Sequence, residues 1–351
     1  MNSVTPRPLV VKAGTAAALW HPGIRTEVLL TGVQSANKLG VLHQTHYVAE
    51  QQVRPRAHAQ DLATYIVKGQ MSFQFDAASK QVAKAGSFVS IPRGTPVSIT
   101  TDEVGTEAIV FSVPAGLDQI FLLTSPRAAE NDDAPPSDLK WPDMKRVQAV
   151  SEQYGLRHIV KLPDKSKKSV TTLMHAAQAL VTNVESAPAY WTKPAIPELW
   201  TILASSGQTD SRYTVTEIKF TKGNAARPLK FVHHDETYFV LGGKATYLLN
   251  RTTETVEKGD FVFIPAGTVF GLRVDSEDWF HAIAIHTPAG IIEGSLDMIP
   301  NLKIEESKVV RDKVPSEDEF EAARPELDPA DAMARMQEIG LSSIAVADPL
   351  K

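Results

Sequence analysis

An internal repeat constrains the fold of this chain more than any other feature of its sequence. The segment GSFVSIPRGTPV (86–97) matches GDFVFIPAGTVF (259–270) at seven of twelve positions, with an offset of 173 residues. Gly69 and Gly243, each at the end of a strand-like run, keep nearly the same spacing, as do two Pro-Ala-Gly tripeptides. Chance similarity does not hold register over such a distance, so the chain is a duplication of one structural unit.

The sequence of each unit predicts antiparallel β-structure. Short runs rich in β-branched and aromatic residues, such as MSFQF, AIVFSV, TYFVL and FVFIP, alternate with Gly, Pro and Asn turns. Strands of this kind that close into a barrel remove exposed edges and enclose an interior that can hold a ligand. Helical pattern is found mainly at 142–155 and 329–340, each with Pro near its start and Gly at its end. We therefore expect an all-β protein with two barrels, each followed by a helix, and domains over 1–160 and 161–351.

The composition excludes several classes of function. With 36 basic and 41 acidic residues the net charge is −5, which does not suit a nucleic-acid or anionic-membrane binder. No apolar run reaches the ~18 residues of a membrane span, and the N-terminus lacks the pattern of a secretion signal, so we expect a cytoplasmic protein. The chain has no cysteine, which excludes disulfides, thiolate nucleophiles and Cys-based metal sites.

The repeated G-x5-P-x-G segment, with strands on both sides, resembles the cupin double-stranded β-helix, or jelly roll, present here twice as in a bicupin. The stretches RPRAH, YIVKGQMSFQF and AGSFVSIPRGT further resemble the fungal quercetin 2,3-dioxygenases. In cupins, a first motif H-x-H-x3-4-E-x6-G and a His three residues after the P-x-G glycine together hold one metal ion. The resembling dioxygenases carry metal only in the N-terminal barrel and have Phe at the last His position of the second barrel, where this chain has Phe270.

The metal positions implied by the resemblance are largely substituted in the first unit. Counting back from Gly69 places Arg56 and His58 at the two His positions and Leu62 at the Glu position, and Val97 replaces the last His. One ligand and a permanent cation cannot hold a divalent ion, so we expect no metal and no other cofactor. Arg56 keeps a positive potential directed into the barrel, which favours an anion, and His58 can move a proton. We predict both as catalytic residues.

The strand VLHQTHY (41–47) alternates, so that His43, Thr45 and Tyr47 share one face. The resemblance implies that this strand contributes substrate contacts, and a gapped count places His43 and Thr45 there. His43 is then a third catalytic candidate, which would form an acid/base pair with His58 if the two converge. The predicted substrate-contacting residues are Thr45, Tyr47, Thr64, Val97 and Ile99.

The second unit offers a different set of candidates. The same count from Gly243 places Glu236 at the carboxylate position and Lys230 and Val232 at the His positions, and strand parity would let His234 join Glu236. Three alternatives stay open for this cluster: a packed interior with a buried Lys230–Glu236 pair, an active role, or a metal site formed by His234 and Glu236 with His281 or His286.

Three hypotheses on function follow. The first is a metal-independent isomerase, cyclase or lyase, including pericyclic closure, that acts on an aromatic or polyketide-like small molecule of secondary metabolism. The second is a quercetinase-type dioxygenase that binds metal through rearranged ligands. The third is a non-catalytic small-molecule-binding cupin. We favour an enzyme, expect a monomer or homodimer, and expect no nucleic-acid or membrane partner.

Overall fold

The computed structural model of the chain describes residues 5–77, 79–129, 134, 139–164, 179–192, 196–296, 301–304, 314, 316–322 and 329–343. Its contacts divide the chain into an N-terminal unit, Met1–Pro6 with Gly14–Glu185, and a C-terminal unit, Arg7–Ala13 with Ser186–Lys351. The division falls further along the chain than the expected boundary at residue 160. The reason is that a late strand of the N-terminal unit, close to residue 180, still pairs with its larger sheet.

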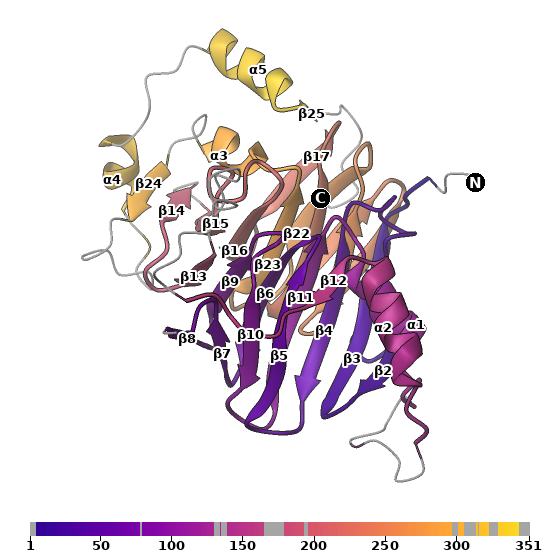
Figure 1. Cartoon of the computed structure of the whole chain (residues 1–351). Helices are drawn as coiled ribbons and strands as arrows, with labels where there is room; N and C mark the ends of the chain where they lie inside the picture. Colours follow the sequence, from indigo (N-terminus) through magenta and orange to yellow (C-terminus); the bar gives the residue numbers. More distant parts are fainter. Residues whose placement is uncertain are drawn as a thin grey trace. The chain divides into compact units, whose positions relative to one another are not determined.

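The N-terminal unit consists of two antiparallel sheets (Figure 1). Its larger sheet contains, in spatial order, β13 (Leu180–Asn183), β9 (Ser87–Ile91), β6 (Asp61–Lys68), β11 (Thr106–Val113), β4 (Gly40–His46), β3 (Ile24–Leu30) and β2 (Ala17–His21). Its smaller sheet contains β12 (Leu156–His158), β5 (Gln51–His58), β10 (Val97–Thr101), β7 (Gln70–Gln74) and β8 (Lys80–Lys84).

The C-terminal unit repeats this arrangement. Its larger sheet contains β1 (Leu9–Val11), β21 (Phe261–Ile264), β18 (Asp235–Gly242), β23 (Phe280–Thr287), β16 (Thr214–Phe220), β15 (Glu198–Ala204), β14 (Ala189–Thr192) and β24 (Asn301–Ile304). Its smaller sheet contains β20 (Thr252–Glu257), β19 (Lys244–Leu249), β22 (Val269–Val274), β17 (Ala225–Phe231) and β25 (Leu341–Ser343). Apart from the edge strands β1, β12, β13 and β25, strands separated by about 173 residues hold equivalent places in the two units, and β24 is an addition at one edge.

The prediction of an all-β protein built from two jelly-roll units is confirmed. The expectation that the strands close into one continuous barrel is not met, because in each unit the described strands form two separate sheets. Apolar side chains fill the space between these sheets. In the N-terminal unit this core includes Leu42, Leu62, Phe73 and Val97, and in the C-terminal unit it is more aromatic, as at Phe270.

Both predicted helices are present. Helix α2 (Met144–Gln153) begins after Asp143, whose carboxylate accepts a hydrogen bond from Lys145 N at 3.1 Å, and α5 (Pro329–Glu338) ends just before Gly340. An Asp at this position satisfies one of the free N–H groups at a helix start.

The sequence analysis missed three shorter helices: α1 (Leu117–Thr124), α3 (Ile291–Leu296) and α4 (Glu317–Ala322). Helices α1 and α3 each follow a Pro-Ala-Gly tripeptide and are too short to show a helical period. Helix α1 contacts α2 and strands β2, β3 and β4 (Figure 1). None of the described helices has the length and apolarity needed to cross a membrane.

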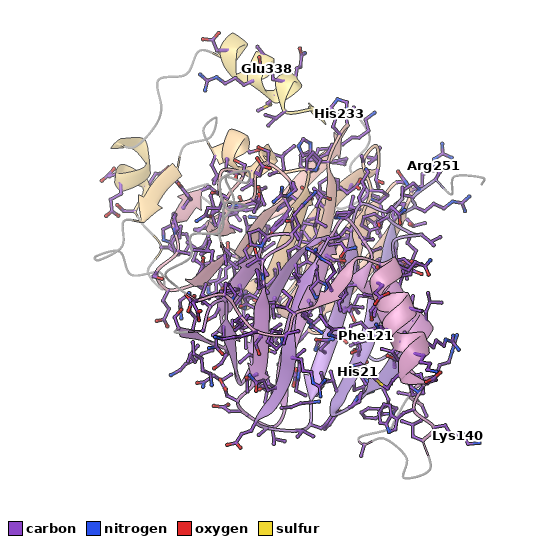
Figure 2. All side chains as sticks on the ribbon, viewed as in Figure 1. His21, Phe121, Lys140, His233, Arg251 and Glu338 are labelled. Carbon is purple, nitrogen blue, oxygen red and sulfur yellow. The ribbon has the colours of Figure 1, made fainter. Side chains whose placement is uncertain are left out.

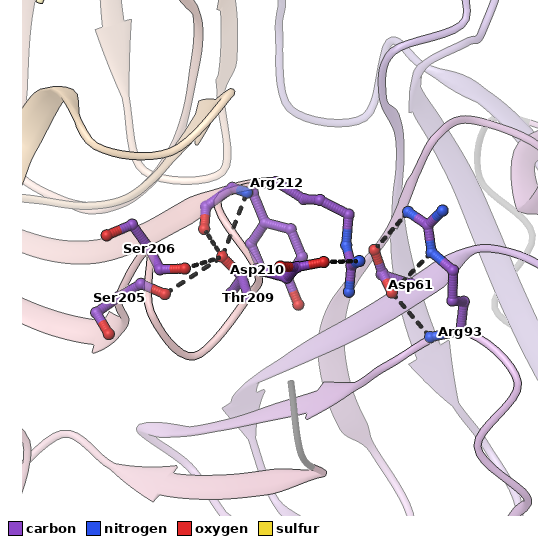
Figure 3. Close-up of polar contacts among 8 residues, drawn as sticks. Asp61, Arg93, Ser205, Ser206, Thr209, Asp210 and Arg212 are labelled. Carbon is purple, nitrogen blue, oxygen red and sulfur yellow. Dashed lines mark hydrogen bonds and ion pairs between the residues drawn. The ribbon is translucent and has the colours of Figure 1, made fainter. Parts of the chain in front are cut away.

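An aspartate fixes the P-x-G turn in each unit. The carboxylate of Asp61 accepts hydrogen bonds from Arg93 N at 2.8 Å and from the Arg93 guanidinium at 3.0 Å (Figure 3). In the C-terminal unit, Asp235 accepts from Ala266 N at 2.7 Å. This shared interaction holds the turn next to the start of β6 or β18, and so sets the register of the strands that carry the site.

The repeated Gly69 leads to a test of the fold. Gly69 has a φ of +78°, and a Cβ placed on it would meet the Thr106 side chain and lie 3.0 Å from Thr106 Cα, whereas Gly94, at φ +76°, has nothing within 4 Å. Gly94→Ala should cost only the left-handed strain of about 1–2 kcal/mol. Gly69→Ala should cost a further 1–3 kcal/mol or so, because backbone must move. Urea unfolding of both variants measures the difference, and equal costs would contradict the packing argument.

Candidate functional site

Strand β5 directs Arg56 and His58 into the interior of the N-terminal unit. Arg56 lies opposite Val97 on β10, and His58 lies opposite Leu156 on β12. Residues opposite each other in an antiparallel pair share a face, and both Val97 and Leu156 are buried. The two predicted catalytic residues therefore project between the sheets from the same face of β5.

His58 is a buried imidazole without a hydrogen-bond partner in the described part of the protein. Its side chain is 4% exposed, and neither Nδ1 nor Nε2 makes a hydrogen bond there. Desolvation lowers the pKa of His58 well below its usual value, and the charges of Arg56 and His158 lower it further. His58 is therefore neutral at pH 7 and able to accept a proton.

Arg56 provides the positive charge of this interior. Its guanidinium is only partly exposed, Nε has no hydrogen-bond partner, and no carboxylate forms an ion pair with it among the described residues. Desolvation lowers the pKa of Arg56 to about 10, so the group stays charged at neutral pH. A cation removed from water without a counter-ion is unfavourable, so an anion that reaches Arg56 would be stabilised.

Strand β4 presents the opposite face to that expected. Leu42 belongs to the core between the sheets, so Gln44 and His46 also point inward and His43 and Thr45 point away. His43 Nδ1 lies 3.0 Å from Glu27 Oε2, on the strand next to β4. The structure therefore does not bring His43 and His58 together, and the expected pair of His43 with His58 is not formed.

The predicted substrate-contacting residues divide between the two faces. Tyr47, just beyond β4, places its ring 5.7 Å from that of Trp20, outside the core that contains Leu42. Thr64 lies opposite Val89 and Val110, both core residues, and so points inward. The remaining inward-facing members of the set are Val97 and Ile99.

Two further histidines of the interior were missed by the sequence analysis. His46 is buried, its Nδ1 lies 2.8 Å from Thr101 Oγ1, and its Nε2 has no partner in the described residues. His21, on the same face of β2 as the core residue Leu19, packs its ring 5.4 Å from Phe121 (Figure 2). The alternation of β4 was visible in the sequence, but nothing in it showed which face is inside.

Burial controls the protonation of both histidines. Desolvation lowers the pKa of His46 to about 4. Desolvation, followed by the charge of Arg56, lowers the pKa of His21 to about 4 as well. The interior of the N-terminal unit thus combines one cation with neutral imidazoles at pH 7.

The side chains at the four cupin ligand positions do not fit a metal ion. Arg56, His58, Leu62 and Val97 supply one uncharged nitrogen donor and one guanidinium, whereas a first-row divalent ion requires three or four nitrogen or oxygen ligands. The described residues contain no group of three or more His, Asp or Glu side chains placed to hold a metal.

In the C-terminal unit, the residues predicted from the sequence to face the interior from β17 are wrong by one position. Gly94 N donates to His58 O, and Gly267 N donates to Phe231 O, so Phe231 is the counterpart of His58, and Leu229 that of Arg56. Leu229 and Phe231 pack against the core, which places Lys230 on the other face of β17. The sequence count failed because the turn before β18 is one residue longer than the turn before β6. No pair of Lys230 and Glu236 therefore forms inside this unit.

Glu236 is held by a chain of buried hydrogen bonds. Its carboxylate accepts from Tyr238 Oη at 2.6 Å and lies 3.1 Å from His286 Nδ1. His286 Nε2 lies 3.4 Å from Thr216 Oγ1, and because a carboxylate only accepts, a hydrogen bond between His286 and Glu236 is donated by Nδ1–H. Burial and the charge of Glu236 raise the pKa of Tyr238 well above its usual value, so its hydroxyl keeps its proton and donates.

The two other histidines proposed for the second unit differ in their placement relative to Glu236. His234 is in the turn between β17 and β18, so strand parity does not apply to it. It is nearly buried, and its Nδ1 has no partner in the described residues. His281 Nε2 lies 2.9 Å from Glu217 Oε1, on the face of β23 opposite His286. The metal-site alternative for these residues finds no support in their placement.

Comparison with solved structures identifies the architecture. A variant of Bacillus subtilis oxalate decarboxylase superposes with a TM-score of 0.54 over 93% of this chain and 89% of that chain, at 11% identity. Procruciferin, an 11S globulin of Brassica napus, gives a TM-score of 0.54 over 81% of this chain and 85% of that chain, at 12% identity. The chain has the bicupin fold. No family model matches the sequence.

A curated relative extends the likeness of this bicupin beyond the fold. Quercetin 2,3-dioxygenase of Bacillus subtilis (strain 168) is 21% identical over 214 residues, which are 60% of this chain and 62% of that protein. The match thus spans less than two thirds of the relative's length. The predicted resemblance of the bicupin to quercetin 2,3-dioxygenases is confirmed, here through a bacterial relative.

The lowered pKa of His46 predicts an acid-sensitive bicupin. Its pKa is about 4 in the folded chain against 6.5 in the unfolded chain, so between these values the unfolded chain binds more protons, and stability falls as the pH falls. Gln at position 46 can still hydrogen-bond to Thr101 but does not titrate. Between pH 7.5 and pH 5, His46→Gln should therefore lose about 2 kcal/mol less free energy of unfolding than the unmodified chain. Urea unfolding at both pH values measures it, with the exposed His233→Gln as control. An unchanged pH dependence in His46→Gln would contradict the assignment.

Proposed function

We propose that the N-terminal unit binds a small organic anion through Arg56 and that His58 transfers a proton to and from it. The observation that carries the proposal is the guanidinium of Arg56, which faces the interior without an ionic partner among the described residues. A phenolate, enolate or carboxylate supplies the missing charge, with charge-assisted hydrogen bonds to the guanidinium.

The reaction class follows from the protonation states. Neutral His58 removes a proton from a carbon or oxygen acid, and Arg56 stabilises the negative charge that develops on the substrate. The resulting imidazolium lies close to Arg56, which favours return of its proton to a different substrate atom. This sequence gives an isomerase, cyclase or lyase that needs no oxidant and no metal.

The walls of the interior favour an aromatic or polyketide-like substrate of secondary metabolism. Phe73, Val97 and Ile99 line the interior with apolar surface, and Phe121 packs against it. A largely apolar pocket with a few polar groups is typical of sites for small organic molecules. His46 and Gln44 face the same interior and add hydrogen-bonding groups to it.

A dioxygenase is the second candidate, favoured by the similarity to quercetin 2,3-dioxygenase. It requires a metal held by His58 and rearranged ligands, which the side chains at the four cupin ligand positions do not favour. A non-catalytic binding protein is the third candidate. In such a protein Arg56 would contribute to ligand affinity, and His58 would have no catalytic role.

Substitution of Arg56 tests anion binding. Arg56→Gln should weaken binding of a phenolate probe, such as a flavonol titrated above its pKa, by about 10–100-fold, because a charge-assisted hydrogen bond contributes about 1.5–3 kcal/mol. Calorimetry on the full chain measures the affinity. Arg157→Gln, which makes the same charge change at an exposed residue of β12, is the matched control and should bind as the unmodified chain does.

Substitution of His58 separates the three functions. For a metal-independent enzyme, His58→Gln should keep anion affinity within a few-fold and lose about 10²-fold or more in turnover. Turnover that consumes oxygen, rises with added iron, copper, nickel or manganese, and stops with a chelator would overturn this function in favour of a dioxygenase. Anion binding with no turnover of any probe would instead support the third candidate, a non-catalytic binding protein.

A further inference from the structure

The interior of the C-terminal unit has the opposite charge to that of the N-terminal unit. Glu236, at the position of Leu62, is 1% exposed. Its hydrogen-bond partners are Tyr238 and His286. No lysine or arginine among the described residues forms an ion pair with it. Among the side chains of β17 that the structure describes, Leu229 and Phe231 pack on this interior, so the position equivalent to Arg56 holds a leucine.

The hydrogen bonds from Tyr238 and His286 fix the orientation of the Glu236 carboxylate. Tyr238 donates from a phenol, and His286 donates from Nδ1 while its Nε2 accepts from Thr216. A carboxylate has lone-pair capacity for further donors beyond these two. The carboxylate of Glu236 is therefore an acceptor of fixed orientation inside an apolar unit, with capacity for a further donor.

Two buried polar atoms close to Glu236 have no partner in the part of the chain that the structure describes. The hydroxyl of Tyr247 is one, and its residue is 1% exposed. The ring of Tyr247 lies 5.5 Å from that of Tyr238, and the charge of Glu236 acts on Tyr247. Nδ1 of His234 is the other. Desolvation lowers the pKa of His234, and the charge of Glu236 opposes that shift. Buried groups of this kind are normally satisfied, so a ligand or water must reach them.

Further aromatic rings belong to the same core as Tyr238 and Tyr247. Phe231 and Phe270 lie 5.3 Å apart, and Trp200 lies 5.1 Å from Phe220, all within the same core. Phe231 and Trp200 are only partly buried, so this end of the interior reaches solvent. Aromatic faces attract cations, most strongly where water is excluded.

We propose that the C-terminal unit holds a second binding site, for an organic ammonium ion, with Glu236 as its counter-ion, the Tyr247 hydroxyl and His234 Nδ1 as further acceptors, and Phe231 and Trp200 at its entrance. An ammonium group carries the N–H donors that these acceptors lack. The site is separate from the anion site around Arg56 and does not depend on the function proposed for it.

Binding of benzylammonium to the full chain tests the proposal, with benzyl alcohol as the neutral analogue of the same shape. Calorimetry at pH 7.5 should show the ammonium binding at least about 10-fold more tightly than the alcohol. Glu236→Gln should abolish that preference, and His281→Gln, on the outer face of β23, should keep it. Arg56→Gln should also keep it, which separates this site from the N-terminal one.

Tyr247→Phe keeps the test decisive if Glu236→Gln fails to fold. The hydroxyl makes no hydrogen bond in the described structure, so its removal should leave the melting temperature unchanged or raised, yet weaken ammonium binding several-fold. Equal affinity of the unmodified chain for the ammonium and the alcohol would overturn the proposal. Ammonium binding unaffected by both Glu236→Gln and Tyr247→Phe would overturn it as well, and would assign the unpartnered atoms to water alone.

Discussion

Alternation of side chains along paired strands determines the chemistry of both units. On β5 it directs Arg56 and His58 between the sheets, and on β17 it gives the equivalent positions to Leu229 and Phe231. A shift of one residue would exchange the inner and outer faces of a strand. The Asp61–Arg93 contact and its Asp235 counterpart fix the turns that set this register. The position of every charge in the interiors depends on these pairings.

The two units keep one scaffold and differ in charge. The N-terminal interior presents Arg56 with neutral histidines, and the C-terminal interior presents Glu236 within a hydrogen-bonded chain. A charge removed from water costs several kcal/mol unless a partner compensates it. Among the described residues no carboxylate pairs with Arg56, and no lysine or arginine pairs with Glu236. In the two proposed sites a ligand of opposite charge compensates each of them. This common requirement connects the anion site to the ammonium site.

The bicupin scaffold does not specify one activity. Proteins as different as an oxalate decarboxylase and an 11S globulin share it with this chain at 11–12% identity. Function in such a fold depends on the side chains directed into each unit. Here the loss of carboxylate and imidazole ligands at Leu62 and Val97 removes the usual donor set, and Arg56 changes the sign of what the interior attracts.

The sequence by itself determined the duplication, the all-β jelly-roll units, the helices near residues 142–155 and 329–340, and the inward places of Arg56, His58, Thr64, Val97 and Ile99. These follow from local patterns and from a repeat that preserves register. Only the tertiary structure decided that His46 and Gln44 face inward while His43, Thr45 and Tyr47 face away, because alternation defines two faces without saying which is buried. The tertiary structure also decided that Lys230 lies on the outer face of β17, because the turn before β18 is one residue longer than its counterpart. It brought His286 to Glu236 through the pairing of β18 with β23, which joins residues distant in the chain.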